Sequence, residues 1–225
     1  MAGRLRHGCE SRLPTGSCDT LGDVPDRYDP STALIVVDVQ NDFADPRGSL
    51  SVTHGAAVVP VINAEAWRAI QVGGFVAYTQ DWHPETTPHF AKDGGIWPVH
   101  CVADSWGAAF HLELEVVGPW VRKGSNGEDG YSGFTMRDAT TEETIATELE
   151  GLLRARSIER VVVAGLATDY CVKATALDAA RLGFATELLE DAIASVDLKP
   201  GDGARAIDEM RAAGVAVGSA GPARA

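Results

Sequence analysis

The sequence predicts one α/β domain built on a mostly parallel β-sheet with helices on both faces. Short apolar runs rich in β-branched residues alternate along the chain with segments whose apolar side chains recur at helical spacing. This alternation is typical of parallel strands joined by right-handed crossovers. The 225 residues suffice for one continuous core, and we find no internal repeat or interdomain linker. We therefore expect a single layered domain.

The first predicted elements lie between residues 32 and 81. TALIVVDV at 32–39 is a strand buried on both faces, followed by the polar cluster QNDFADPRGS. Residues 58–73 have helical spacing and stop at a pair of glycines, where a helix is expected to end. GFVAYTQD at 74–81 is the second strand. It opens into an aperiodic polar stretch, 81–107, and a loop of that length in a compact domain is usually functional.

The second half of the chain continues the alternation. The expected elements are a short strand at 120–124, an amphipathic helix at 140–157 with a threonine N-cap, a buried strand at 159–166, a helix at 167–183, a strand within 184–194, a helix at 203–214 and a last strand at 215–219. In such sheets ligands bind beyond the carboxyl ends of the strands. Every candidate chemical residue below follows a strand.

Charge and composition narrow the class of partner. The formal net charge of −13 and the pI near 4.8 argue against a nucleic-acid or anionic-membrane partner, because both would repel the chain. A small molecule is the expected partner. We expect the folded domain to span residues 31–219, with a poorly ordered N-terminal extension at 1–30 and a short tail at 220–225. A mis-assigned start codon is the alternative explanation of the extension.

Cysteine usage and the absence of targeting segments predict a cytoplasmic protein. The four cysteines are irregularly spaced and form no CxxC pair, which favours free thiols in a reducing compartment. The N-terminus lacks the apolar stretch of a secretory signal, and no segment reaches transmembrane length.

Three residues suit nucleophilic catalysis. Cys171 is expected in the first turn of a helix, where the helix dipole favours thiolate and the free amides of Ala167 and Cys171 could stabilise an oxyanion; the alternative is a small buried hydrophobe. Asp38 could take the thiol proton, or it could simply cap a helix or bridge a loop. Lys123 beside them would favour both anions, although a lone lysine is more often a solvated surface residue.

The long loop carries a candidate metal site. Asp81, His83, His89 and His100 lie within twenty positions, and carboxylate with imidazole suits zinc, iron or manganese. Four unrelated polar residues are the alternative. Aromatic walls for a flat ring could come from three residues that could equally be ordinary core residues, namely Phe43, Trp97 and Tyr131.

Seven motifs together resemble the nicotinamidase and pyrazinamidase branch of the isochorismatase-like cysteine hydrolases. They are DVQNDF at 38–43, GSL at 48–50, DWHP at 81–84, WPVHCV at 97–102, RKG at 122–124, YSGF at 131–134 and GLATDYCV at 165–172. In order and spacing they cover about residues 32–218. The resemblance implies an isochorismatase-like three-layer fold.

The resemblance also implies roles for these residues. Asp38, Lys123 and Cys171 would form a triad that converts nicotinamide, and pyrazinamide as well, to the acid and ammonia through a thioester, in NAD salvage. It implies a cis peptide between Leu166 and Ala167. Phe43, Trp97, Tyr131 and Leu166 would contact the substrate.

For the metal, the resemblance implies one divalent ion, zinc first and iron or manganese otherwise, with no organic cofactor. Asp81, His83 and His100 would be ligands, with His89 a fourth in some members, and the ring nitrogen of the substrate would bind the ion. Tyr170 stands where some members have histidine.

Two other functions stay open. An amidase acting on N-carbamoyl or ureido compounds would share the triad without the metal loop. A silent α/β module would use the fold only as a scaffold. The sequence does not define the oligomeric state, and a homo-oligomer is open.

Overall fold

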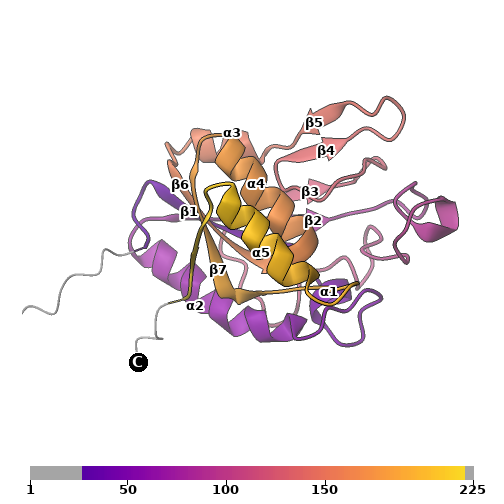
Figure 1. The fold of residues 1–225 in the computed structure, drawn as a ribbon, viewed down its shortest axis with the longest axis horizontal. Coiled ribbons are helices and arrows are strands. Elements are labelled where there is room, and N and C mark those ends of the chain that lie inside the picture. Colours follow the sequence, from indigo (N-terminus) through magenta and orange to yellow (C-terminus); the bar gives the residue numbers. More distant parts are fainter. Residues whose placement is uncertain (1–26, 221–225) are drawn as a thin grey trace, which may run out of the picture.

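The structure, a computed structural model, describes residues 27–220. A six-stranded parallel sheet with strand order β3-β2-β1-β6-β7-β8 forms its centre (Figure 1). The strands are β1 (Thr32–Val37), β2 (Phe75–Asp81), β3 (Trp120–Lys123), β6 (Arg160–Leu166), β7 (Ala185–Ala194) and β8 (Ala216–Gly218). The predicted parallel sheet is confirmed.

Helices cover both faces of the sheet. Helix α2 (Val58–Gln71) lies on one face, and α3 (Leu149–Arg154), α4 (Lys173–Arg181) and α5 (Asp202–Ala212) lie on the other (Figure 1). A four-residue helix, α1 (Asn41–Ala44), follows β1. The α2 layer, the sheet and the layer of α3, α4 and α5 are the three layers of the predicted fold.

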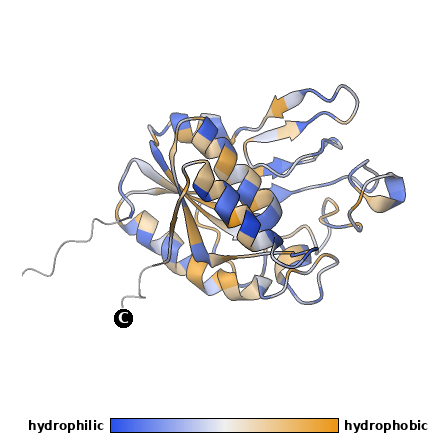
Figure 2. Cartoon of the chain, in the orientation of Figure 1, coloured by the Kyte–Doolittle hydropathy of each residue, from blue (hydrophilic) through white to orange (hydrophobic). Residues whose placement is uncertain are grey.

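Strand β1 shows why both faces are filled. Leu34 and Val36 belong to the core under α2, whereas Ile35 belongs to the core under α3, α4 and α5. All three are fully buried, and each such side chain contributes roughly 1.5–3 kcal/mol. Figure 2 shows the central strands as mainly hydrophobic and the helices as mixed, as expected for a sheet enclosed between two helical layers.

One predicted helix is partly wrong. The helix expected at 140–157 begins only at Leu149, and the segment before it is β5 (Thr144–Ala146), which pairs antiparallel with β4 (Thr135–Arg137). The amides of Thr140 and Thr141 donate to Asp138 Oδ1 at 2.8 Å and close the turn between these strands. Pairing with a distant strand therefore overrides the local helical pattern.

The helix predicted at 167–183 begins differently from expectation. Its first turn, Thr168–Val172, is a π-helical turn, and regular α4 starts only at Lys173. Such turns occur mostly as single insertions at functional sites. Cys171 therefore lies in an irregular turn rather than in the first turn of an α-helix.

The two ends of the described chain meet. Arg27 forms ion pairs with Glu65 at 3.1 Å and Glu187 at 3.0 Å, and it donates to the carbonyl of Ser219. Tyr28 donates to the fully buried Glu65 at 2.9 Å. This network joins the segment before β1 to α2, to β7 and to the segment after β8.

The predicted extension at 1–30 and tail at 220–225 fall mostly outside the described residues. Residues 27–30 are described, and the buried Tyr28 ties them to the domain. Among residues 27–220, no helix is both long and apolar enough to cross a bilayer.

Candidate active site and metal centre

The carboxyl ends of four neighbouring strands gather the candidate residues. Asp38 directly follows β1, Asp81 ends β2, Lys123 ends β3, and Cys171 lies in the turn after β6. Asp81 and Lys123 are direct partners in the β2–β3 register. Parallel strands end at the same edge, which brings together side chains that are far apart in the sequence.

Lys123 lies at the centre of the site. Its Nζ is 2.8 Å from Asp38 Oδ2, 2.8 Å from Asp81 Oδ1 and 3.6 Å from Cys171 Sγ, and it donates to the carbonyl of Tyr131 at 3.2 Å. The residue is 1% exposed. Burial alone would lower the pKa of Lys123, but the charges of Asp38 and Asp81 outweigh it and raise that pKa well above its usual value. A permanent ammonium therefore joins two carboxylates and the thiol.

The surroundings of Cys171 favour the protonated thiol. Burial raises the pKa of Cys171 well above its usual value; Lys123 opposes this shift, while the carboxylates of Asp38 and Asp81 add to it. These effects oppose the preference for thiolate that the helix dipole would give at this position. Burial also raises the pKa of Asp38, against the opposing effect of Lys123. Asp38 is thus suited to take the thiol proton.

The turn between β6 and Cys171 has an unusual backbone. The peptide between Leu166 and Ala167 is cis, as the resemblance predicts. Gly165 has φ 120°, and a Cβ there would lie 2.1 Å from the carbonyl oxygen of Val37, so only glycine lets β6 approach β1 at this point. Ala167 lines the pocket described below. Leu166 does not, because its side chain is fully buried in the core.

Three histidines converge beside the triad. The ligand atoms of His83, His89 and His100 lie within 4.8 Å of one another. His89 Nδ1 is 2.7 Å from Asp129 Oδ1 and His100 Nδ1 is 2.7 Å from the carbonyl of Pro98, so each keeps Nε2 for the cluster. A histidine that binds a metal through one ring nitrogen usually donates the other to a carboxylate or carbonyl, which fixes the ring.

The chemistry of this donor set fits a divalent ion. Neither ring nitrogen of the buried His83 has a hydrogen-bond partner among the described residues. Burial lowers its pKa to about 4, so the ring is neutral and keeps a lone pair at pH 7. Asp81 Oδ2 lies 3.9 Å from His83 Nε2, while Oδ1 pairs with Lys123. Asp81 thus contacts both the histidine cluster and the group formed by Asp38, Lys123 and Cys171.

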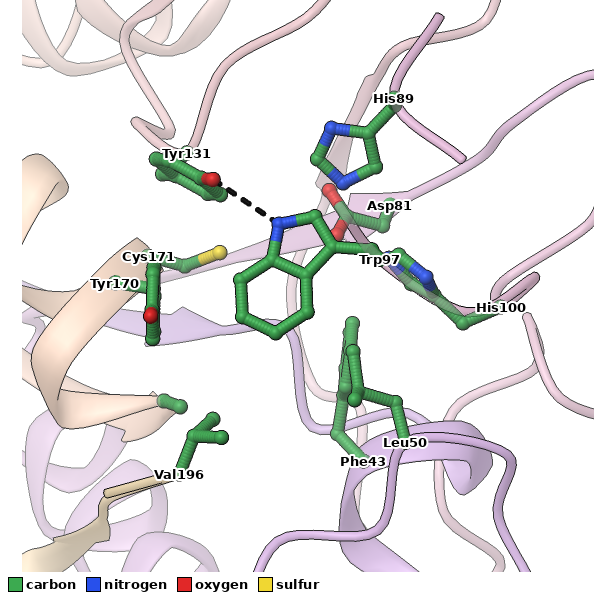
Figure 3. A pocket seen from close by; sticks show the side chains of 11 residues that line it. Phe43, Leu50, Asp81, His89, Trp97, His100, Tyr131, Tyr170, Cys171 and Val196 are labelled. Atoms are coloured by element: carbon green, nitrogen blue, oxygen red, sulfur yellow. Dashed lines mark hydrogen bonds between the residues drawn. The ribbon is translucent and has the colours of Figure 1, made fainter. Parts of the chain in front are cut away.

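The Lys123–Cys171 group and the histidine cluster open into one pocket (Figure 3). Its lining consists of Phe43, Leu50, Asp81, His89, Trp97, His100, Tyr131, Ala167, Tyr170, Cys171 and Val196. Figure 3 shows the sulfur of Cys171 on one side of the Trp97 indole and His89, Asp81 and His100 on the other. Trp97 Nε1 donates to the hydroxyl of Tyr131 at 3.0 Å. A flat ligand here would touch aromatic side chains, the thiol and the histidines.

Comparison with known proteins places this chain. Residues 32–221 match the family model described as the Isochorismatase domain. The chain belongs to the isochorismatase family. This family member is 40% identical over 188 residues to a nicotinamidase/pyrazinamidase of Mycobacterium tuberculosis, across 81% of this chain and 96% of the relative.

Two solved structures resemble the isochorismatase-family chain in fold. A pyrazinamidase of Pyrococcus horikoshii in complex with zinc is 38% identical, with a TM-score of 0.75 over 84% of this chain and 99% of the other. PnC1 from L. infantum in complex with nicotinate is 37% identical, with a TM-score of 0.77 over 85% and 94%. The predicted isochorismatase-like fold is confirmed.

Some lining residues of this family member were not selected from sequence as site residues. Leu50 lies in the GSL motif and Tyr170 precedes Cys171, so both carried a local signal. The ring centroids of Tyr170 and Trp97 are 4.8 Å apart, so Tyr170 packs edge-on against Trp97 and forms a wall of the pocket. Val196 follows β7 in a segment without a motif, so only the fold reveals it.

Proposed function

We propose that this chain is a metal-containing nicotinamidase that hydrolyses nicotinamide to nicotinic acid and ammonia, accepts pyrazinamide, and serves NAD salvage. The observation that carries the proposal is one aromatic pocket lined both by Cys171 and by three groups of the histidine and aspartate cluster. Nicotinamide has a matching pair of groups, a ring nitrogen and a carboxamide. The relatives named nicotinamidase and pyrazinamidase support this assignment.

Binding would orient the substrate between the two groups. Phe43, Trp97 and Tyr131 provide the walls for the ring. Asp81, His83, His89 and His100 would hold one divalent ion, which would bind the ring nitrogen and so direct the carboxamide toward the thiol. We propose zinc, with iron and manganese as ions that share these ligands. No organic cofactor is expected.

The acyl chemistry would fall to the triad. Asp38 takes the proton of the Cys171 thiol, and the sulfur attacks the amide carbon. The amides of Ala167 and Cys171 are proposed to stabilise the resulting oxyanion. Asp38 then gives its proton to the amide nitrogen, the C–N bond breaks, and ammonia leaves a thioester. Water, deprotonated by Asp38, cleaves the thioester, and the proton returns to the thiol as nicotinic acid leaves.

Lys123 has a positioning role in this scheme. Its ammonium keeps Asp38 and Cys171 close to each other while one carboxylate cycles between charged and neutral forms. The triad acts as a unit, so loss of Asp38 should reduce turnover nearly as much as loss of Cys171. A cytoplasmic location stays a prediction from the sequence.

The test is ammonia release from nicotinamide by the purified protein, before and after chelation and after single additions of zinc, iron and manganese. Chelation should abolish release and one metal should restore it. Cys171→Ala, the control, should lower release at least ~1000-fold with metal present.

Two results would contradict the proposal. Full activity after verified metal removal would refute the metal-anchored mechanism and leave the triad alone. Failure on every ring carboxamide with metal present would redirect the substrate class to ureido compounds, and failure there would favour the silent module.

A further inference from the structure

Because β1 ends before β2 does, the last residues of β2 have no neighbouring strand on their β1 side, although β3 still pairs with them on the other side. The paired register of these strands ends at Val36 and Tyr78, and Asp38 adopts φ 48°, which turns the chain out of the strand. The last direct bond runs from the amide of Asp38 to the carbonyl of Thr79 at 3.3 Å. Strand β2 nevertheless continues to Asp81. The peptide groups of Asp81 are buried, so they need other partners on this side.

The side chain of Gln40 supplies those partners. The amide of Asp81 donates to Gln40 Oε1 at 2.8 Å, and Gln40 Nε2 donates to the carbonyl of Asp81 at 2.7 Å. Gln40 Nε2 also donates to the carbonyl of Ala108 at 2.8 Å. A side-chain carboxamide thus forms the pair of bonds that a neighbouring strand would form. Gln40 is fully buried, which fixes its orientation.

These contacts form a ring that links Gln40, Asp81, Lys123 and Asp38. Gln40 is two residues from Asp38, and it holds the main chain of Asp81. Asp81 pairs with Lys123 at 2.8 Å, and Lys123 pairs with Asp38 at 2.8 Å. A shift of the Asp81 main chain would therefore move its carboxylate relative to both Lys123 and His83.

We propose that Gln40 is a positioning residue that sets the separation between the metal cluster and the triad by holding the main chain of Asp81. One oxygen of Asp81 then reaches Lys123 while the other faces His83. The proposal rests on the proposed amidase function for its kinetic readout only, since its metal-binding readout needs no substrate.

The chain offers a matched control in Gln80. This side chain is also buried, at 4% exposure, and its Nε2 donates to the same carbonyl of Ala108 at 2.9 Å. Its Oε1 accepts from Arg122 at 3.1 Å, and no bond of its side chain to the main chain of Asp81 is found in the described structure. Gln40→Met and Gln80→Met therefore each remove one side-chain amide that donates to the carbonyl of Ala108. Only the first removes the contacts with Asp81.

The experiment compares the wild-type protein with these two variants. Urea unfolding first establishes that each variant is folded. Zinc dissociation constants are then measured by competition with a chromophoric chelator, and kcat and KM for nicotinamide are measured at saturating zinc. Gln40→Met should weaken zinc binding at least ~10-fold, the range seen when supports of metal ligands are lost, and should lower kcat even when zinc is saturating. Gln80→Met should stay within about threefold of wild type in both.

Every outcome bears on the proposal. Zinc affinity of folded Gln40→Met equal to that of Gln80→Met would overturn it, as would a wild-type protein that binds no zinc. Weakened zinc binding in Gln40→Met, in a protein inactive on ring carboxamides, would uphold the positioning role and contradict the proposed function. If Gln40→Met does not fold, Gln40→Glu takes its place: it keeps an acceptor for the Asp81 amide and loses the amide donors to both carbonyls, so it should also weaken zinc binding, and unchanged zinc affinity would overturn the proposal.

Discussion

Replacing Lys123 with methionine should destabilise the metal-free protein strongly. The ammonium is the cation placed between Asp38 and Asp81, both within 2.8 Å of it and almost fully buried. Methionine fills a similar volume and has no charge, so Lys123→Met leaves the two carboxylates facing each other. Turnover should be lost as well.

The size of the effect follows from the geometry. The ligand atoms of Asp38 and Asp81 lie within 4.8 Å of each other. At an effective dielectric constant of about 20, two unit charges at that distance repel by about 3.5 kcal/mol. Removing one partner of a buried ion pair typically costs about 3–5 kcal/mol. Both estimates predict a loss of about 3–5 kcal/mol in the free energy of unfolding.

Urea unfolding of chelated protein, analysed by linear extrapolation, measures this loss. The control is Lys173→Met. Lys173 pairs with Glu209 at 2.9 Å, but the two side chains are 29% and 57% exposed, so its loss should cost less than about 1 kcal/mol. A loss for Lys123→Met no larger than for Lys173→Met would refute the view that this ammonium holds the two carboxylates together.

Two further changes probe the metal cluster. Gly124→Ala places a Cβ 2.6 Å from His83 Nδ1, so the ring must move and zinc affinity should fall at least ~10-fold; Gly127→Ala, with a similar positive φ of 88° and open space around it, should leave affinity unchanged. Equal zinc affinities by chelator competition would contradict this reading. Asp129→Asn removes the carboxylate that holds His89 at 2.7 Å and should weaken zinc binding roughly 10-fold in the same assay, whereas unchanged binding would mean that His89 needs no such support.

The fold was predictable where local pattern and packing agree. The apolar runs that became β1, β2 and β6 are unambiguous because strands buried on both faces admit few polar residues. Residues 140–147 were not predictable, because TTEETIAT suits a helix as well as a strand. Its pairing with Thr135–Arg137 is a tertiary contact that local spacing does not encode.

For the site, too, the sequence predicts which residues lie at the sheet edge but not the tertiary contacts between them. Asp38, Asp81 and Lys123 each follow an apolar run in the sequence, and this pattern alone suffices to place them at one edge of the sheet. The strand order, which makes β1 the neighbour of both β2 and β6, had to come from the fold. The raised pKa of Cys171 could not be predicted either, since it depends on burial and on the two nearby carboxylates. Gln40 lies in the DVQNDF motif, but its contacts depend on where β1 turns away from β2, which the motif does not show.

The contact of Arg27 with Ser219 means that the two ends of the described part of the chain, residues 27–220, lie close together. Because no pocket-lining residue belongs to either of these two end segments, a few linking residues between them would leave the pocket walls untouched. The exposed turn at 139–143 could then provide new termini, since loop tips of this kind tolerate a break. A circular permutant of this design would begin synthesis at a different strand, while the proposed catalytic and metal-binding residues kept their neighbours in the fold.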